Sequence, residues 1–219
     1  MMSMYNIFMN SSSLSIMLME QFHDYTMMFL SMITSFIFLI IFRITKLKNT
    51  NLNFKENINL EIIWTILPML ILFLIAYPSI YYLYLFDLSY NPSISVKVIG
   101  AQWYWIYELM EKSEKLNTDS YMILDNELMK KNVYKMGWRL LETDTRLSIP
   151  YSTEIQFIVT SYDVIHSFSI PELGLKMDAI PGRLNTTNLM ILRPGLYYGQ
   201  CTEICGTGHS FMPISMEAY

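Results

Sequence analysis

The hydrophobic pattern of the first part of the chain indicates a membrane anchor. Residues 25–42 and 62–86 are two runs without a charged side chain. A helix needs about 20 apolar residues to cross the hydrocarbon core of a bilayer, so each run predicts a membrane-spanning helix. Buried core helices of a soluble protein are the alternative, and runs of this length make it the weaker one. Asp24 is expected to cap the first helix.

Charged residues around the two runs predict how this helical hairpin is oriented. The connecting segment, residues 43–61, carries the basic residues Arg43, Lys46, Lys48 and Lys55, whereas only acidic charges precede the first run. Basic loops remain on the cytoplasmic or matrix side of a membrane. Both termini and everything after residue 87 are therefore expected in the opposite compartment.

Beyond residue 87 apolar positions alternate with polar ones. SISVKVIG (93–100) and TEIQFIVT (153–160) each predict a strand, and NTTNLMILRPGLYYG (185–199) predicts two strands separated by a turn. Short strands without a helical period indicate a β-sandwich or barrel. The charged stretch 107–138 is expected to be an irregular, exposed excursion. We predict two domains, residues 1–88 with the membrane hairpin and residues 89–219 with the strands.

Composition supports a membrane protein and excludes one class of partner. The 219-residue chain is 53% hydrophobic and only 16% charged, which is too apolar for an ordinary soluble domain of this size. Its net charge of −4 gives no indication of nucleic-acid binding, although it permits a basic protein partner.

The segment CTEICGTGHSFMP (201–213) concentrates the chain's metal-binding chemistry. A disulfide between Cys201 and Cys205 would close a very short loop and stabilise little. Zinc binds thiolates and imidazoles but has little use for the Met212 thioether. Copper accepts thiolate, imidazole and thioether, and two thiolates can bridge two copper ions. Such a site needs a second imidazole besides His209, and His166 is the only other histidine after residue 87.

Several motifs make the chain similar to a known family. It resembles subunit II of cytochrome c oxidase, of the mitochondrial type, through FHDYT, EIIWTILP, AQWYW, DSYM, IPGRLN, RPGLYYGQC and EICGTGHSFMPI. The resemblance extends over nearly the whole chain. It implies an α+β membrane protein in which a transmembrane two-helix hairpin precedes a cupredoxin-like Greek-key β-barrel. It also implies that cytochrome c delivers electrons to a dinuclear copper A centre, and that they pass to haem in subunit I, where oxygen is reduced to water.

The resemblance assigns ligand roles to matching residues. Cys201 and Cys205 match the bridging thiolates. His166 and His209 match the terminal imidazoles, and Met212 matches the thioether ligand of one copper ion.

The resemblance also implies roles outside the sulfur ligands. Glu203 matches the residue whose backbone carbonyl binds the other copper ion, and whose carboxylate binds a magnesium ion shared with subunit I. Trp103 matches the aromatic residue through which electrons arrive from cytochrome c. Glu61 matches the acid at the matrix-side mouth of a proton path. Four acids match the surface that receives basic cytochrome c: Glu108, Asp119, Asp144 and Asp163.

The same resemblance implies a setting for the chain. It places the chain in the mitochondrial inner membrane, with both termini and the copper domain in the intermembrane space. Its partners would be subunits I and III and further subunits of a proton-translocating respiratory complex. Two rival functions remain: a membrane-tethered carrier with a single copper ion, and a metal-free scaffold like the subunit of a quinol oxidase. The scaffold's relatives lack these cysteines.

Overall fold

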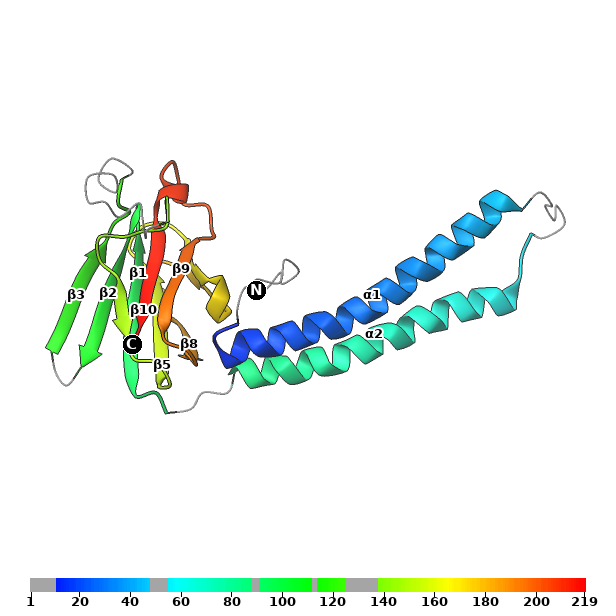
Figure 1. Ribbon diagram of the computed structural model, residues 1–219, viewed down its shortest axis with the longest axis horizontal. Coiled ribbons are helices and arrows are strands. Elements are labelled where there is room, and N and C mark those ends of the chain that lie inside the picture. Colours follow the sequence, from blue (N-terminus) through cyan, green and yellow to red (C-terminus); the bar gives the residue numbers. More distant parts are fainter. Residues whose placement is uncertain (1–10, 48–54, 88–90, 112–113, 125–137) are drawn as a thin grey trace. The chain divides into compact units, whose positions relative to one another are not determined.

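The computed structural model describes residues 11–47, 55–87, 91–111, 114–124 and 138–219 (Figure 1). The described residues form two compact units. One consists of Leu18–Asp87, and the other combines the residues up to Met17 with those that follow Asp87. The expected sequence of two long helices followed by a β-domain is confirmed.

Two long helices make up the membrane hairpin, α1 (Leu14–Lys46) and α2 (Ile58–Asp87). Both are long and apolar enough to span a membrane, and their most apolar windows contain no buried residue. Large side chains such as Phe38 and Phe73 are exposed around the helices. Because a helix that is apolar on all sides is stable only in an apolar environment, this surface suits lipid or the helices of a partner.

The helices begin earlier than the charge-free runs predict. Asp24 lies inside α1, so the expectation that it caps this helix is wrong. Ser13 is the cap, and its Oγ accepts a hydrogen bond from Ile16 N at 3.3 Å. In α2 the Oδ1 of Asn57 accepts from Leu60 N at 3.2 Å. A charge-free run marks only the part of a helix that hydrocarbon can hold, and these helices continue beyond it.

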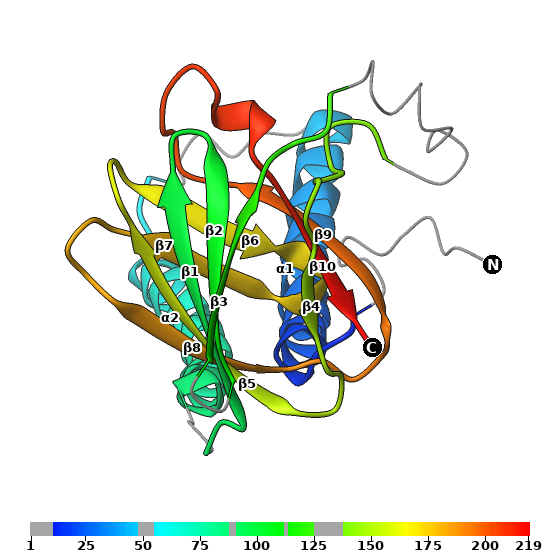
Figure 2. The ribbon, with the colours of Figure 1, turned by 90° about the vertical axis from the view of Figure 1, so that its left-hand side faces the viewer.

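The β-domain consists, in the described part of the chain, of two five-stranded sheets (Figure 2). The first sheet has the order β3 (Glu114–Ser120), β2 (Tyr104–Glu111), β1 (Ile94–Ala101), β5 (Glu154–Ser161) and β8 (Asn185–Met190). The second has the order β4 (Leu147–Ile149), β10 (Pro213–Ala218), β9 (Gly195–Cys201), β6 (His166–Ile170) and β7 (Leu175–Ala179). The pairs β1–β5 and β10–β4 are parallel, and the others are antiparallel.

One prediction about this domain is confirmed, and another needs correction. The strands of residues 185–199 form as expected, but β8 pairs with β5 in one sheet and β9 pairs with β10 and β6 in the other. The stretch 107–138 is not irregular throughout, because its first part forms the β2–β3 hairpin with Tyr107 opposite Thr118. Residues 112–113 and 125–137 of that stretch lie outside the described residues. Alternation indicates a strand but does not identify its partner.

The core between the sheets is aromatic and leads directly to the cysteine segment. Phe168 is fully buried, and its ring lies 5.1 Å from that of Trp105 and 6.3 Å from that of Phe157. The same apolar cluster includes both cysteines and Met212. The rigid packing of a protein interior therefore extends to the candidate ligands.

The start of α1 packs on the β-domain, within the same compact unit. Ser13 Oγ donates to Leu173 O at 2.7 Å, and Ser12 N donates to Glu172 O at 3.2 Å. Ile16 is buried, and its backbone lies against Gly174. Residues 11–17 thus belong to this unit, although the sequence division at residue 88 assigns them to the N-terminal part.

Candidate metal centre

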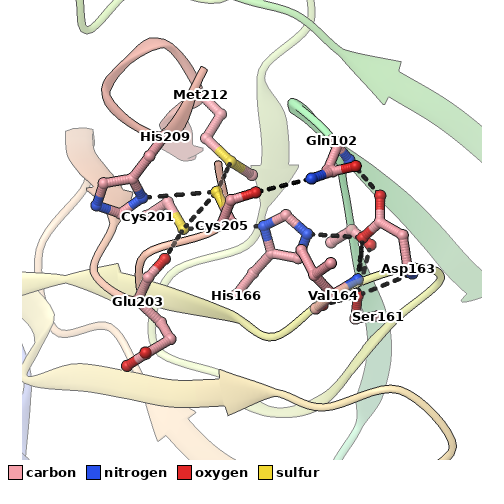
Figure 3. A network of polar contacts seen from close by, with 11 residues as sticks. Gln102, Ser161, Asp163, Val164, His166, Cys201, Glu203, Cys205, His209 and Met212 are labelled. Carbon is pink, nitrogen blue, oxygen red and sulfur yellow. Dashed lines mark hydrogen bonds and ion pairs between the residues drawn. The ribbon is translucent and has the colours of Figure 1, made fainter. Parts of the chain in front are cut away.

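Two neighbouring strands and one loop bring the candidate ligands together (Figure 3). His166 begins β6 and Cys201 ends β9, and these strands are paired with Phe168 opposite Cys201. The chain then turns through Cys205 into the short 3-10 helix η3 (His209–Phe211) and reaches Met212 just before β10. The pairing of β6 with β9 therefore positions residues that are far apart in the sequence.

The two cysteines are free thiols, not a disulfide. Their Sγ atoms lie 4.0 Å apart, and both residues are buried. A disulfide requires sulfurs about 2.05 Å apart. The spacing leaves both sulfurs available as ligands, so the disulfide alternative does not describe this structure.

The other donors surround this sulfur pair. His166 Nδ1 lies 3.9 Å from Cys201 Sγ, and His209 Nδ1 lies 3.5 Å from Cys205 Sγ. Met212 Sδ is 3.5 Å from Cys205 Sγ, and the backbone oxygen of Glu203 is 3.3 Å from Cys201 Sγ. Each of the other four predicted copper ligands thus lies within 3.9 Å of one of the two cysteine sulfurs.

The donor set fits copper better than zinc. The ligand atoms of His166, Cys201 and Cys205 all lie within 4.8 Å of one another, close enough to share metal ions. Soft thiolates and a thioether select copper, and imidazole suits it as well. A structural zinc site would use four nitrogen or sulfur donors and would leave the Met212 thioether without a role.

Burial keeps most of the site dry. His166 is 0% exposed, and Cys201, Cys205 and Met212 are buried, while His209 is half-buried. Glu203 is exposed, and Figure 3 shows its carboxylate pointing away from the sulfurs. The backbone oxygen and the carboxylate of Glu203 therefore face in different directions.

The two thiols differ in acidity. Burial by itself would raise the pKa of Cys201. Hydrogen bonds with the His166 side chain and with backbone groups outweigh burial, and they lower the pKa below its ordinary value, to about 7. Burial and the negative charge of Cys201 raise the pKa of Cys205 to about 12. Burial lowers the pKa of His166, but hydrogen bonds with Cys201 and Asp163 leave it raised. The metal-free site thus gives up one thiol proton far more readily than the other.

Asp163 supports the site and is not a free surface charge. Its Oδ1 lies 2.8 Å from His166 Nε2 and accepts from Val164 N at 2.6 Å. Burial raises the Asp163 pKa, but hydrogen bonds with His166 and two backbone groups lower it below its ordinary value. A carboxylate only accepts hydrogen bonds, so the ring proton of His166 sits on Nε2 and Nδ1 is left to bind a metal. The sequence placed Asp163 among the docking acids, and its position three residues before His166 was the signal for this role.

The remaining predicted docking acids differ in their surroundings. Glu108 is only 8% exposed, and its Oε2 accepts from Lys97 Nζ at 3.1 Å. The expectation that Glu108 presents a free charge is therefore wrong, because Lys97 and Glu108 face each other across β1 and β2. Asp119 and Asp144 are exposed.

Trp103 lies in the turn between β1 and β2. It packs against the ligand loop, residues 202–212, which connects β9 to β10. It is 36% exposed. A Cβ atom added to Gly208 would lie 2.4 Å from Trp103 Cδ2, which shows how closely the indole approaches the loop backbone. Glu61 lies in the first turn of α2 with an exposed side chain, in the other compact unit.

Comparisons with known proteins agree with this architecture. The family description "Cytochrome C oxidase subunit II, periplasmic domain" matches residues 94–219, and "Cytochrome C oxidase subunit II, transmembrane domain" matches residues 2–82. The periplasmic domain of subunit II of cytochrome oxidase (CoxB) from Bradyrhizobium japonicum is 37% identical, with a TM-score of 0.53, over 60% of this chain and 88% of that one. A mixed-disulfide complex of a thioredoxin-like protein with subunit II is 37% identical over 61% of this chain and 86% of that one, with a TM-score of 0.49.

Proposed function

This chain belongs to the family of cytochrome c oxidase subunit II, and we propose that its β-domain takes electrons from cytochrome c at a dinuclear copper centre. Members of the family are the subunit through which electrons enter a haem-copper terminal oxidase, and this chain has that function. The oxygen chemistry takes place in a partner subunit, which we identify as subunit I.

The convergence of two buried free thiols with two imidazoles carries this proposal. Cys201 and Cys205 would bridge two copper ions, with His166 and His209 as terminal ligands. The Met212 thioether would complete the ligand set of one copper ion, and the backbone carbonyl of Glu203 would complete that of the other. The bound copper pair supplies a site that gains and loses a single electron. The ligands sit on packed strands and a buried loop, so the chain holds them in nearly the same place for both charge states.

Trp103 is proposed as the point where electrons arrive. It is an exposed aromatic residue, and its indole packs on the loop between Cys205 and His209. The exposed acids Asp119 and Asp144 would attract a basic cytochrome c and raise its rate of association.

The Glu203 carboxylate is proposed to bind magnesium together with subunit I. It is exposed and points away from the sulfurs, whereas its own carbonyl faces Cys201 (Figure 3). Carboxylates are preferred ligands of magnesium. One residue would thus join the copper centre to a site completed by the neighbouring subunit.

The cellular setting is part of the same proposal. We place the chain in the mitochondrial inner membrane with the copper domain in the intermembrane space, beside subunits I and III and further subunits. The basic residues between the two helices support this orientation. Glu61, at the start of α2, would then lie on the matrix side, at the mouth of a proton path. The domain boundary near residue 88 would separate membrane from aqueous surroundings.

Metal analysis of the full-length chain and of its Cys201→Ser variant tests the proposal. The proposal predicts two copper ions per wild-type chain and loss of the paired centre when one bridging sulfur is removed. A single-copper carrier would instead retain one working copper ion in Cys201→Ser. A scaffold would bind no copper in either protein.

A further inference from the structure

Gln102 joins the two sides of the metal centre, and no role proposed above accounts for it. It lies in the turn between β1 and β2, immediately before Trp103. Its side-chain Nε2 donates a 2.8 Å hydrogen bond to the backbone oxygen of Cys205. Its backbone N donates a 2.6 Å hydrogen bond to Asp163 Oδ2. Figure 3 shows Gln102 beside both groups, the ligand loop and the carboxylate that holds His166.

The ligand loop has no side chain where this turn meets it. Gly206 has a φ of +127°, a conformation that residues with a side chain rarely adopt. A Cβ atom there would lie 3.2 Å from Gln102 Nε2 and 3.1 Å from Trp103 Cζ2. At Gly208 it would lie 2.4 Å from Trp103 Cδ2. The amide of Gln102 and the indole of Trp103 therefore rest directly on the backbone between Cys205 and His209.

We propose that Gln102 is a positioning residue for electron input, because its amide fixes the Trp103 turn against the copper-ligand loop. The inference rests on the proposed function, in which electrons pass from Trp103 to this loop. Gln102 and Trp103 are exposed on one side, and on the other side the indole packs on the loop backbone without a hydrogen bond to it that the structure describes. The two hydrogen bonds of Gln102 add a directional constraint to this packing, one to each of the segments that carry copper ligands.

The chemistry of the contact separates this positioning role from a role in holding copper and from a role in docking a partner protein. The Gln102 amide reaches a carbonyl oxygen and not a ligand atom, so its loss should leave copper bound. The amide nitrogen donates to the loop, so we assign it to the loop and not to a partner protein. What its loss should change is the fit of the indole to the loop, and with it the rate at which electrons pass from the indole to the copper centre.

The test compares assembled oxidase that carries Gln102→Met with oxidase that carries Gln156→Met. Methionine keeps the length of the side chain and removes the amide donor. Gln156 is a matched control, because it lies in β5 and its Oε1 accepts a 3.4 Å hydrogen bond from Ser95 Oγ. The measurements are copper per chain and the rate at which reduced cytochrome c reduces the copper centre, over a range of cytochrome c concentrations.

We expect Gln102→Met to lower the limiting rate at saturating cytochrome c, with unchanged copper content and half-saturation. Gln156→Met should behave as wild type. Gly208→Ala, which pushes the indole away while Gln102 is intact, should lower the same limiting rate.

Three results would overturn the inference. An unchanged limiting rate in Gln102→Met would show that the amide does not position Trp103. A change in half-saturation alone would make Gln102 a docking contact, and loss of copper would make it a structural support of the ligands. A second variant, Gln102→Glu, also removes the amide donor and must give the same slow rate. Failure of the proposed function is distinct, since wild-type oxidase would then hold no copper pair on this chain or would not accept electrons there.

Discussion

The carboxylate of Asp163 lies 2.8 Å from Nε2 of His166 and leaves the Nδ1 of this histidine facing the sulfur of Cys201 at 3.9 Å. The carboxylate thereby fixes both the tautomer and the orientation of a buried ring. A ligand held in this way is ready to bind metal without rearrangement, which explains why an exposed turn contributes to the centre.

Removal of this carboxylate should weaken copper binding. We expect Asp163→Leu to lower the copper affinity of the chain by about 10- to 100-fold, because the second partner of a ligating histidine has an effect of this size. Asp163→Asn retains an acceptor oxygen and should recover part of the loss. Competition with a copper chelator measures both variants, with Asp119→Asn as the control. Equal affinity in Asp163→Leu and wild type would exclude the positioning role.

The metal-free chain should ionise its two thiols far apart in pH. The Cys201 pKa is lowered to about 7 and the Cys205 pKa is raised to about 12. The ultraviolet absorbance of thiolate should therefore rise by one equivalent around pH 7 and by a second only in strongly alkaline solution. Because protons compete with metal for both thiolates, copper uptake should weaken as the pH falls, and it should weaken more steeply below about pH 7, where Cys201 is protonated as well. The Cys201→Ser variant should lack the first step, and two equal steps near pH 9 in the wild type would contradict the prediction.

The two proposed roles of Glu203 should separate in one variant. Glu203→Gln keeps the backbone carbonyl that faces Cys201 and loses the charged carboxylate. We expect the assembled oxidase to retain its copper and to lose magnesium, because a neutral amide is a poorer ligand for a hard cation. After magnesium is replaced by manganese, electron paramagnetic resonance measures how much metal occupies the proposed magnesium site. Full manganese binding in Glu203→Gln would assign that site to other residues.

Acids on the β-domain should differ in their effect on cytochrome c. Asp144→Asn should lower the association rate at low salt by about two- to threefold and reduce its salt dependence, because Asp144 is exposed. Glu108→Gln should leave the association rate unchanged and cost about 1 kcal/mol of stability, since Glu108 is paired with Lys97. Stopped-flow mixing and thermal unfolding measure these quantities. A large effect of Glu108→Gln on association would return that residue to the docking surface.

The sequence predicted the elements and the sulfur-rich part of the site for clear physical reasons. Charge-free runs and alternation depend only on local residue order, so the helices and strands such as β1 and β5 could be recognised. The chain has only two cysteines and three histidines, which made the candidate donors few. His166 could be selected because it is the only other histidine after residue 87, but only the pairing of β6 with β9 shows that it reaches Cys201.

What the sequence did not predict depends on strand register and on turns. Glu108 faces Lys97 because β1 and β2 are paired in one register, and no local pattern contains that information. Asp163 and Gln102 act through hydrogen bonds from turns, where residue types follow no period. The predicted role of Asp24 as a helix cap was wrong because a helix can carry a charged residue where it extends beyond the hydrocarbon.

Electron paramagnetic resonance of the oxidised full-length protein, with copper counted in the same sample, tests the central claim most directly. The account predicts two copper ions per chain and a hyperfine pattern from one unpaired electron shared equally between them. A pattern from a single copper nucleus, or a sample without copper whose two cysteines are joined to each other, would contradict it.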